Sequence, residues 1–259
     1  MTDSEEQEES GGSKQPFDTL QGRQRFVAKV FALVLVMLSL IAFGAFFPVV
    51  FPDERATPEN SGKDLSHPVR RFFNEHWYLI FIPWIVWMVT YFMLICCDCV
   101  RMTFPCNIIT LVIFTVSAAL MMPFITASHN LFGVALAFVV TALLALVIII
   151  FAKFTSIDFT GCGFLIWLLS LGVFFFALFV ILYIIIVRPS LSYILFIDMI
   201  LSLLFIVLYC IYLARDVQLV LGGRRCEIRE DQWILGAVLI FTDLFGLLMT
   251  MIGVTGRAG

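Results

Sequence analysis

Charged residues are scarce in this chain. Only 14% of its 259 residues are Asp, Glu, Lys or Arg, whereas about a quarter of the residues in soluble domains are charged. Hydrophobic residues make up 61% of the chain and are gathered into long runs. This composition excludes an ordinary soluble globular domain.

Motifs of enzymes and structural metal sites are also missing. The sequence has no GxSxG, HExxH or P-loop motif, and Asp243 lacks the GxGD setting of intramembrane aspartyl proteases. No second cysteine pair at zinc-binding spacing accompanies Cys96 and Cys99, and the odd total of seven cysteines implies no disulfide framework. The cluster Cys96-Cys97-Asp98-Cys99 leaves open metal binding, palmitoylation or ordinary reduced thiols. We expect no enzymatic activity, no resident cofactor and no nucleic-acid partner.

Seven apolar runs dominate the sequence. They cover Val30–Phe51, Trp77–Cys97, Phe104–Ser128, Leu131–Ala152, Gly161–Val187, Ser190–Ala214 and Trp233–Thr255. Each run reaches the ~20 residues that a helix rising about 1.5 Å per residue needs to cross a bilayer. The sequence therefore predicts an all-α membrane protein with a seven-helix transmembrane domain over residues 27–259, in contact with the lipid bilayer. The last run could also be re-entrant, and residues 1–26 are predicted to be a disordered, polar tail.

Basic residues are distributed unevenly between the two sides of this predicted bundle. Ten of them fall before the first span or in the even-numbered connections: Lys14, Arg23, Arg25, Lys29, Arg101, Lys153, Arg215, Arg224, Arg225 and Arg229. Six fall on the other side: Arg55, Lys63, Arg70, Arg71, Arg188 and Arg257. The positive-inside rule then predicts a cytosolic N-terminus and a C-terminus on the far side of the membrane.

Two aspartates stand in unusual places. Asp216 lies just past the sixth run, and Asp243 lies in the middle of the seventh. An ionised carboxylate at the centre of a membrane helix costs roughly 3 kcal/mol on insertion scales, so it is expected to face protein or water. If the sixth helix continues past Asp216, the two carboxyl groups can meet near the cytosolic end of the bundle and share a proton. They would then form a pH sensor or gate, and carboxylates also suit Ca²⁺ as ligands. An inert hydrogen bond between helices is the alternative.

A third aspartate, Asp198, precedes Asp216 by 18 residues. This separation is about five helical turns, so both side chains project from one face of a helix, roughly 27 Å apart. One acid at each end of a single face suggests a cation path with a luminal mouth at Asp198. The alternative is that Asp198 merely reaches the far membrane interface.

Several segments resemble the transmembrane Bax inhibitor motif family. They are Ala214-Arg215-Asp216-Val217-Gln218-Leu219-Val220-Leu221-Gly222-Gly223, Glu230-Asp231-Gln232-Trp233-Ile234-Leu235-Gly236-Ala237 and Thr242-Asp243. Two further segments are similar to its lifeguard branch: Cys96-Cys97 leading to Arg101 and Phe104-Pro105-Cys106-Asn107-Ile108-Ile109, and Asp158-Phe159-Thr160-Gly161-Cys162. The resemblance runs in order from about Arg25 to the end of the chain.

This resemblance implies a seven-helix fold of Bax inhibitor type in the endoplasmic reticulum or Golgi. It implies a pH-sensitive Ca²⁺ leak that restrains apoptosis, with the family's paired aspartates at Asp216 and Asp243. The family's second-span arginine, which helps to hold the closed state, would correspond to Arg101. The alternative is a non-conducting protein that binds apoptosis-regulating membrane proteins or channels.

Overall fold

The structure is a computed structural model and describes residues 20–48 and 68–255. In these ranges seven segments are long and apolar enough to cross a membrane. They comprise α1 (Leu20–Phe46), η2 with α3 (Trp77–Ile80 and Phe81–Cys96), α5 (Cys106–Thr126), α6 (Leu131–Phe154), η3 with α7 (Thr160–Cys162 and Gly163–Val187), α8 (Leu191–Leu221) and α9 (Trp233–Thr255). The predicted all-α, seven-span fold is confirmed. Helices suit lipid because every backbone polar group between their ends is hydrogen-bonded within the segment.

Two helix boundaries differ from the prediction. Helix α1 begins at Leu20, so residues 20–26 belong to the bundle and not to the predicted tail; residues 1–19 lie outside the described residues. Helix α8 continues past Ala214 to Leu221. Both extensions contain polar residues, so the hydropathy pattern did not predict them, but each extension buries one face of its helix. Phe26 is packed in the core, and so are Val217 and Val220.

Three short elements complete the described part of the chain: α2 (Pro68–Glu75), α4 (Asp98–Met102) and η4 (Glu230–Gln232). Helix α2 occupies the end of a connection that the sequence predicted to be irregular. It is docked by Phe73, whose ring centroid lies 4.9 Å from that of Phe124 on α5. An ion pair of 2.6 Å between Arg71 and Glu75 joins its exposed face, with the i,i+4 spacing that helices favour.

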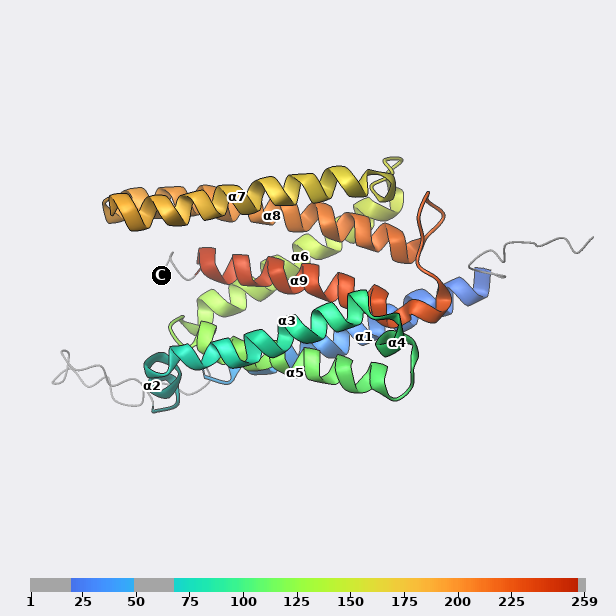
Figure 1. Ribbon diagram of the computed structural model, residues 1–259, viewed down its shortest axis with the longest axis horizontal. Helices are drawn as coiled ribbons and strands as arrows, with labels where there is room; N and C mark the ends of the chain where they lie inside the picture. The colour runs from blue at the N-terminus through green and yellow to red at the C-terminus, as the bar shows by residue number, and fades with distance from the viewer. Residues whose placement is uncertain (1–19, 49–67, 256–259) are drawn as a thin grey trace, which may run out of the picture.

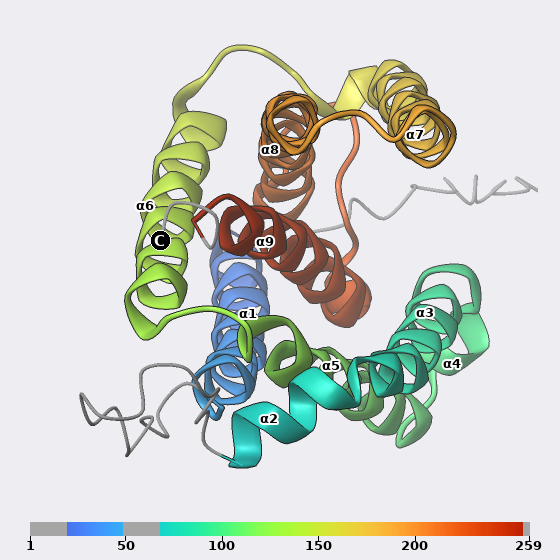
Figure 2. The same ribbon diagram turned by 90° about the vertical axis from the view of Figure 1, so that its left-hand side faces the viewer.

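Helix α9 forms the centre of the bundle. Viewed end-on, it is surrounded by α1, α5, α6 and α8, while α7 lies outermost and packs on α8 (Figure 2). In the most apolar stretch of α9, 61% of the residues are buried, against 11% for the span that contains α7. The side chains of α7 therefore face mainly the lipid, and its buried positions, Ile166, Val173 and Val180, form one stripe.

The same end of the bundle carries several connections that are distant in sequence. The start of α1, the α4 turn and the α8–α9 connection all lie at the right-hand end in Figure 1. Helix α8 stops there at Gly222 and Gly223, whose φ values of +65° and +73° are readily adopted by glycine. Arg23 of α1 packs directly against Gly222, where a β-carbon would collide with the guanidinium group. This end contains the candidate site.

Candidate functional site

The structure brings Asp216 of α8 and Asp243 of α9 together. Their exposed fractions are 2% and 7%, and their carboxyl groups lie close enough to share a hydrogen bond. Two carboxyl groups can make such a contact only if one of them carries a proton, because a carboxylate only accepts hydrogen bonds. The contact arises because α8 continues past Asp216, which was the condition on which the sequence predicted it.

Arg215 is the cation beside this pair. Its Nη1 donates to Asp216 Oδ1 at 3.0 Å, and its side chain is 28% exposed. Gly163, the first residue of α7, lies next to the guanidinium, whose Nη2 would be in ordinary van der Waals contact, at 3.6 Å, with a β-carbon added there. Sequence reasoning missed this partner because consecutive helix residues point in different directions, and only a long side chain can fold back to its neighbour.

Arg101, the predicted gate partner, binds elsewhere in this structure. It is buried, and its Nη1 donates to the carbonyl oxygens of Leu94 and Ile95 at 3.3 and 3.1 Å. Its Nη2 pairs with Asp98. These bonds cap the C-terminal end of α3, where helix carbonyls lack backbone partners. Among the described residues, none of the hydrogen bonds found for Arg101 reaches the aspartate pair, so its role in a gate stays a prediction.

Asp198 lies apart from the pair. It shares the continuous helix α8 with Asp216, as the same-face prediction requires. It is half-buried, in a part of α8 where no residue before Leu208 is fully buried. The structure therefore does not join Asp198 to the packed site.

Aromatic side chains close the bundle around the pair. Tyr91 of α3 and Tyr209 of α8 are near enough to Asp243 to interact with its charge. Tyr91 stacks on Phe114 of α5 at 6.3 Å between centroids, and Phe114 meets Phe241 of α9 at 5.6 Å. The side chains of Phe114 and Phe241 are fully buried.

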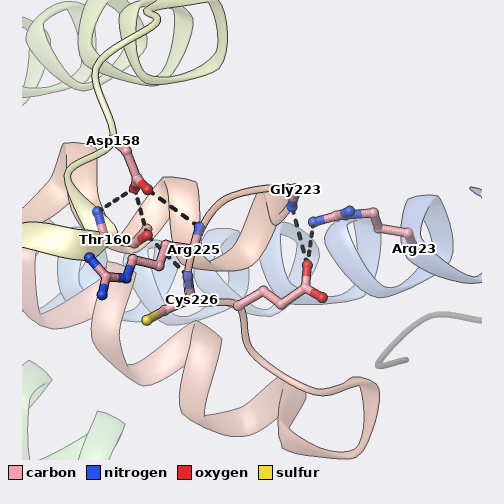
Figure 3. Close-up of polar contacts among 7 residues, drawn as sticks. Arg23, Asp158, Thr160, Gly223, Arg225 and Cys226 are labelled. Atoms are coloured by element: carbon pink, nitrogen blue, oxygen red, sulfur yellow. Dashed lines mark hydrogen bonds and ion pairs between the residues drawn. The ribbon is translucent and has the colours of Figure 1, made fainter. Parts of the chain in front are cut away.

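A set of polar contacts, which we call the loop clamp, joins the α6–α7 and α8–α9 connections (Figure 3). Asp158 Oδ1 accepts hydrogen bonds from the hydroxyl and the amide of Thr160 at 2.6 and 2.9 Å, and Asp158 Oδ2 accepts from the amide of Arg225 at 3.3 Å. Thr160 Oγ1 accepts from the amide of Cys226 at 3.2 Å. The Thr160 hydroxyl, with the backbone amides, lowers the pKa of Asp158 below its ordinary value.

Gln218 connects the loop clamp to the aspartate pair. It is 1% exposed and lies two residues after Asp216 on α8. Its Oε1 accepts from the amide of Phe159 at 2.9 Å, and its Nε2 donates to the carbonyl oxygens of Ile157 and Ala152 at 2.9 and 3.3 Å. All three partners lie some sixty residues away in sequence, which explains why sequence reasoning left Gln218 without a role. The end of α8 is thereby fixed to the α6–α7 connection.

The donor set around the pair is incomplete for a resident Ca²⁺ ion. Ca²⁺ takes six to eight oxygen ligands, and two carboxylates offer at most four oxygens. Arg215 already occupies one of these oxygens. Across residues 20–48 and 68–255, no group of three or more His, Cys, Asp or Glu side chains is arranged to hold a metal ion. Cys96, Cys97 and Cys99 are exposed, free thiols, so they give the metal-binding alternative no support.

Comparison with known proteins agrees with this architecture. The chain is 29% identical to human protein lifeguard 3 over 231 residues, which cover 88% of this chain and 67% of the relative. It is 28% identical to mouse protein lifeguard 3 over 241 residues, which cover 92% and 71%. The family model described as "Inhibitor of apoptosis-promoting Bax1" matches residues 23–258, which include both aspartates and, apart from the first residues of α1, all of the described spans. The chain therefore belongs to the Bax inhibitor family, in its lifeguard branch.

Proposed function

We infer from membership of this family that the chain is a multi-pass membrane protein involved in apoptosis regulation. We propose that it acts as a pH-sensitive Ca²⁺ leak in the endoplasmic reticulum or Golgi, with its N-terminus in the cytosol, and that it restrains apoptosis by lowering stored Ca²⁺. This role is a conduit and not an enzyme. The observation that carries the proposal is the buried contact between the carboxyl groups of Asp216 and Asp243.

The proposed gate is the proton shared by the two carboxyl groups. With the proton present, a hydrogen bond joins α8 to α9 at the pair. Without it, two negative charges lie side by side away from water, and their repulsion changes how α8 packs on α9. Because Gln218 joins the same end of α8 to the α6–α7 connection, such a movement would also strain the hydrogen bonds of the loop clamp.

The proposed path for the cation leads past the pair. Buried carboxylates attract a cation, and the two aspartates would bind Ca²⁺ only in passing, since the donor set is incomplete. The rings of Phe114 and Phe241 would close the path in the state described here. A luminal mouth at Asp198 is part of the proposal and rests on the shared helix face alone.

A non-conducting role is the second candidate. The broad apolar surface of α7, of which only three residues are buried, favours it because a partner's transmembrane helix could pack there. In that case the protein would bind apoptosis-regulating membrane proteins without passing ions itself.

Ca²⁺ flux through the purified full-length protein in liposomes, measured at several pH values, separates the two functions. A leak predicts flux well above that of protein-free liposomes and a clear dependence on pH. The control variant is Asp231→Asn, which removes a carboxylate that is 46% exposed and lies outside the pair. Flux equal to that of protein-free liposomes at every pH would leave only the non-conducting role.

A further inference from the structure

Helices α1, α6 and α9 enclose a groove that the proposed leak does not use. Helices α1 and α6 both pack along α9 but hardly touch one another, which leaves a cavity of about 440 Å³ between them. Its walls include Val34 and Leu38 of α1, Ala142 and Ile149 of α6, and Leu244 and Leu248 of α9. This volume lies within the range of about 300–1,000 Å³ that is typical of ligand pockets.

The groove opens towards the bilayer and follows the axis of α6. Leu35 and Leu146 stand on its two rims and are 65% and 54% exposed on a surface that faces lipid. Along α6 the lining extends from Phe138 to Ile149. At about 1.5 Å per residue this distance is roughly 17 Å, or about half of the ~30 Å hydrocarbon core. The groove therefore matches an acyl chain of a single leaflet in length and in polarity.

A basic cavity lies beyond one end of this groove. One helical turn after Ile149, Lys153 and Arg224 flank a second cavity of about 240 Å³. Arg224 is held there by hydrogen bonds to the carbonyl oxygens of Thr155 and Ser156. Among the described residues that line the two cavities, none is acidic. Val27 and Phe31 of α1 pack in one cluster with Ala152 and Leu221. The two cavities therefore border the same set of packed residues.

We propose that this pair of cavities binds an anionic phospholipid. One acyl chain lies in the α1–α6–α9 groove, and the phosphate lies between Lys153 and Arg224. Lipid tails are as apolar as the groove itself, so the chain alone gives little preference over the bulk bilayer. Selectivity comes from the two cations at the membrane surface, which attract anionic headgroups. The occupied leaflet is the one on the side where α1 begins.

Photo-crosslinking of the full-length protein in vesicles tests this site. The vesicles contain phosphatidylcholine with phosphatidylserine, and a trace of either lipid carries a photoactivatable group in its acyl chain. The site predicts that the phosphatidylserine probe labels residues 31–42 and 138–149 several-fold more than the phosphatidylcholine probe does. Equal labelling by the two probes, or phosphatidylserine labelling of α7 as strong as that of the groove, would show ordinary annular lipid and overturn the proposal.

Two variants with matched controls locate the chain and the headgroup separately. Ala142→Phe fills the groove and should reduce its labelling at least fivefold, whereas Leu143→Phe, which faces lipid next to the groove, should not. Lys153→Gln should lower the ratio of phosphatidylserine to phosphatidylcholine labelling several-fold without altering the fold, since Lys153 is exposed. Arg229→Gln, an exposed cation outside the cavity, should leave that ratio unchanged. A ratio that survives Lys153→Gln would refute the headgroup assignment.

Discussion

The four residues from Arg215 to Gln218 make four different kinds of contact. Arg215 donates to the neighbouring carboxylate, Asp216 meets Asp243, Val217 packs in the core, and Gln218 binds the α6–α7 connection. Successive helix residues point about 100° apart, so one turn of α8 reaches several partners at once. A substitution at any of these positions therefore acts on the others through the same helix end.

Arg215 should set the pH at which the aspartate pair titrates. Its guanidinium lies 3.0 Å from Asp216 and favours the carboxylate over the protonated acid. Arg215→Gln should therefore move the pH midpoint of Ca²⁺ flux to a higher value, by about one unit or less because Arg215 is partly exposed to solvent. Arg215→Lys, which keeps the charge, should restore most of the midpoint. An unchanged midpoint in Arg215→Gln would show that this cation does not act on the titrating group.

Asp158 should make folding stability depend on acid pH. Its folded-state pKa lies below the ordinary value because the carboxylate accepts hydrogen bonds from Thr160 and from backbone amides. Its stabilising effect is therefore fully present above the unfolded pKa, about 3.9. It is lost as pH falls through the lowered folded-state value.

Thr160→Val removes the strongest of these hydrogen bonds and tests the effect. The variant should unfold a few degrees below the wild type at neutral pH, and the difference should shrink as the pH falls below 4. Thermal unfolding in detergent micelles measures the difference in unfolding temperature at neutral pH and its change with pH. Thr155→Val is the control, at a hydroxyl outside the clamp. A difference that stays constant down to acid pH would mean that the ionised form of Asp158 is not what Thr160 stabilises.

At the residue scale, the sequence predicted that Asp216 and Asp243 can meet, but it did not predict which side chains surround them. Asp216 and Asp243 stood out because acids are rare in apolar runs. Arg215, Gln218 and Tyr209 did not, since their partners are set by tertiary packing across α6, α7 and α9. Arg101 was chosen by resemblance, and its hydrogen bonds to the end of α3 depend on the α4 turn, which a hydropathy pattern does not predict.

At the scale of the elements, α1 and α5 approach each other closely at Gly44. A β-carbon at this position would lie 2.3 Å from the carbonyl oxygen of Ala119, a backbone atom that cannot rotate away. Small residues let membrane helices come into such contact, where packing provides much of the association energy. The close approach places α5, and with it Phe114, against the core that also contains Phe241 and Phe245 of α9.

Gly44→Ala should separate α1 from α5 and destabilise the bundle by about 1–3 kcal/mol, as overpacking does. Gly172→Ala provides the matched control, because within the described residues no atom outside the adjoining backbone of α7 lies within 4 Å of a β-carbon added there. That control should be neutral or stabilise by up to about 1 kcal/mol, since alanine favours helix more than glycine does. Reversible unfolding of each variant in mixed micelles gives both values. A Gly44→Ala variant as stable as Gly172→Ala would contradict the close contact.

The spans themselves could be predicted because length and hydropathy suffice to identify them. The boundaries at Leu20 and Leu221 could not, because polar residues at membrane ends fit a helix or a connection equally well. Helix α2 was missed for a related reason. Its sequence, Pro68–Glu75, is short and polar, and it is helical where Phe73 docks on α5.

At the scale of the whole molecule, a series of contacts around α9 links the helices to one another and to their connections. The pair joins α9 to α8, the loop clamp joins α8 to the α6–α7 connection, and Glu227 binds both Arg23 of α1 and the amide of Gly223 at 3.1 Å. The contacts of one bundle end thus form a connected set around the aspartate pair, on which we propose that a proton is shared. In this account, titration of that proton changes the packing of the bundle end and hence the permeability to Ca²⁺.

A double-substitution cycle on the aspartate pair tests this central claim most directly. Ca²⁺ flux through liposomes is measured from acid to alkaline pH for the wild type, Asp216→Asn, Asp243→Asn and the double variant. If one proton is shared, either single substitution should abolish most of the pH dependence, and the second should add little to the first. Two single substitutions whose effects on the pH profile simply add would contradict a shared proton and leave the pair as an inert contact between helices.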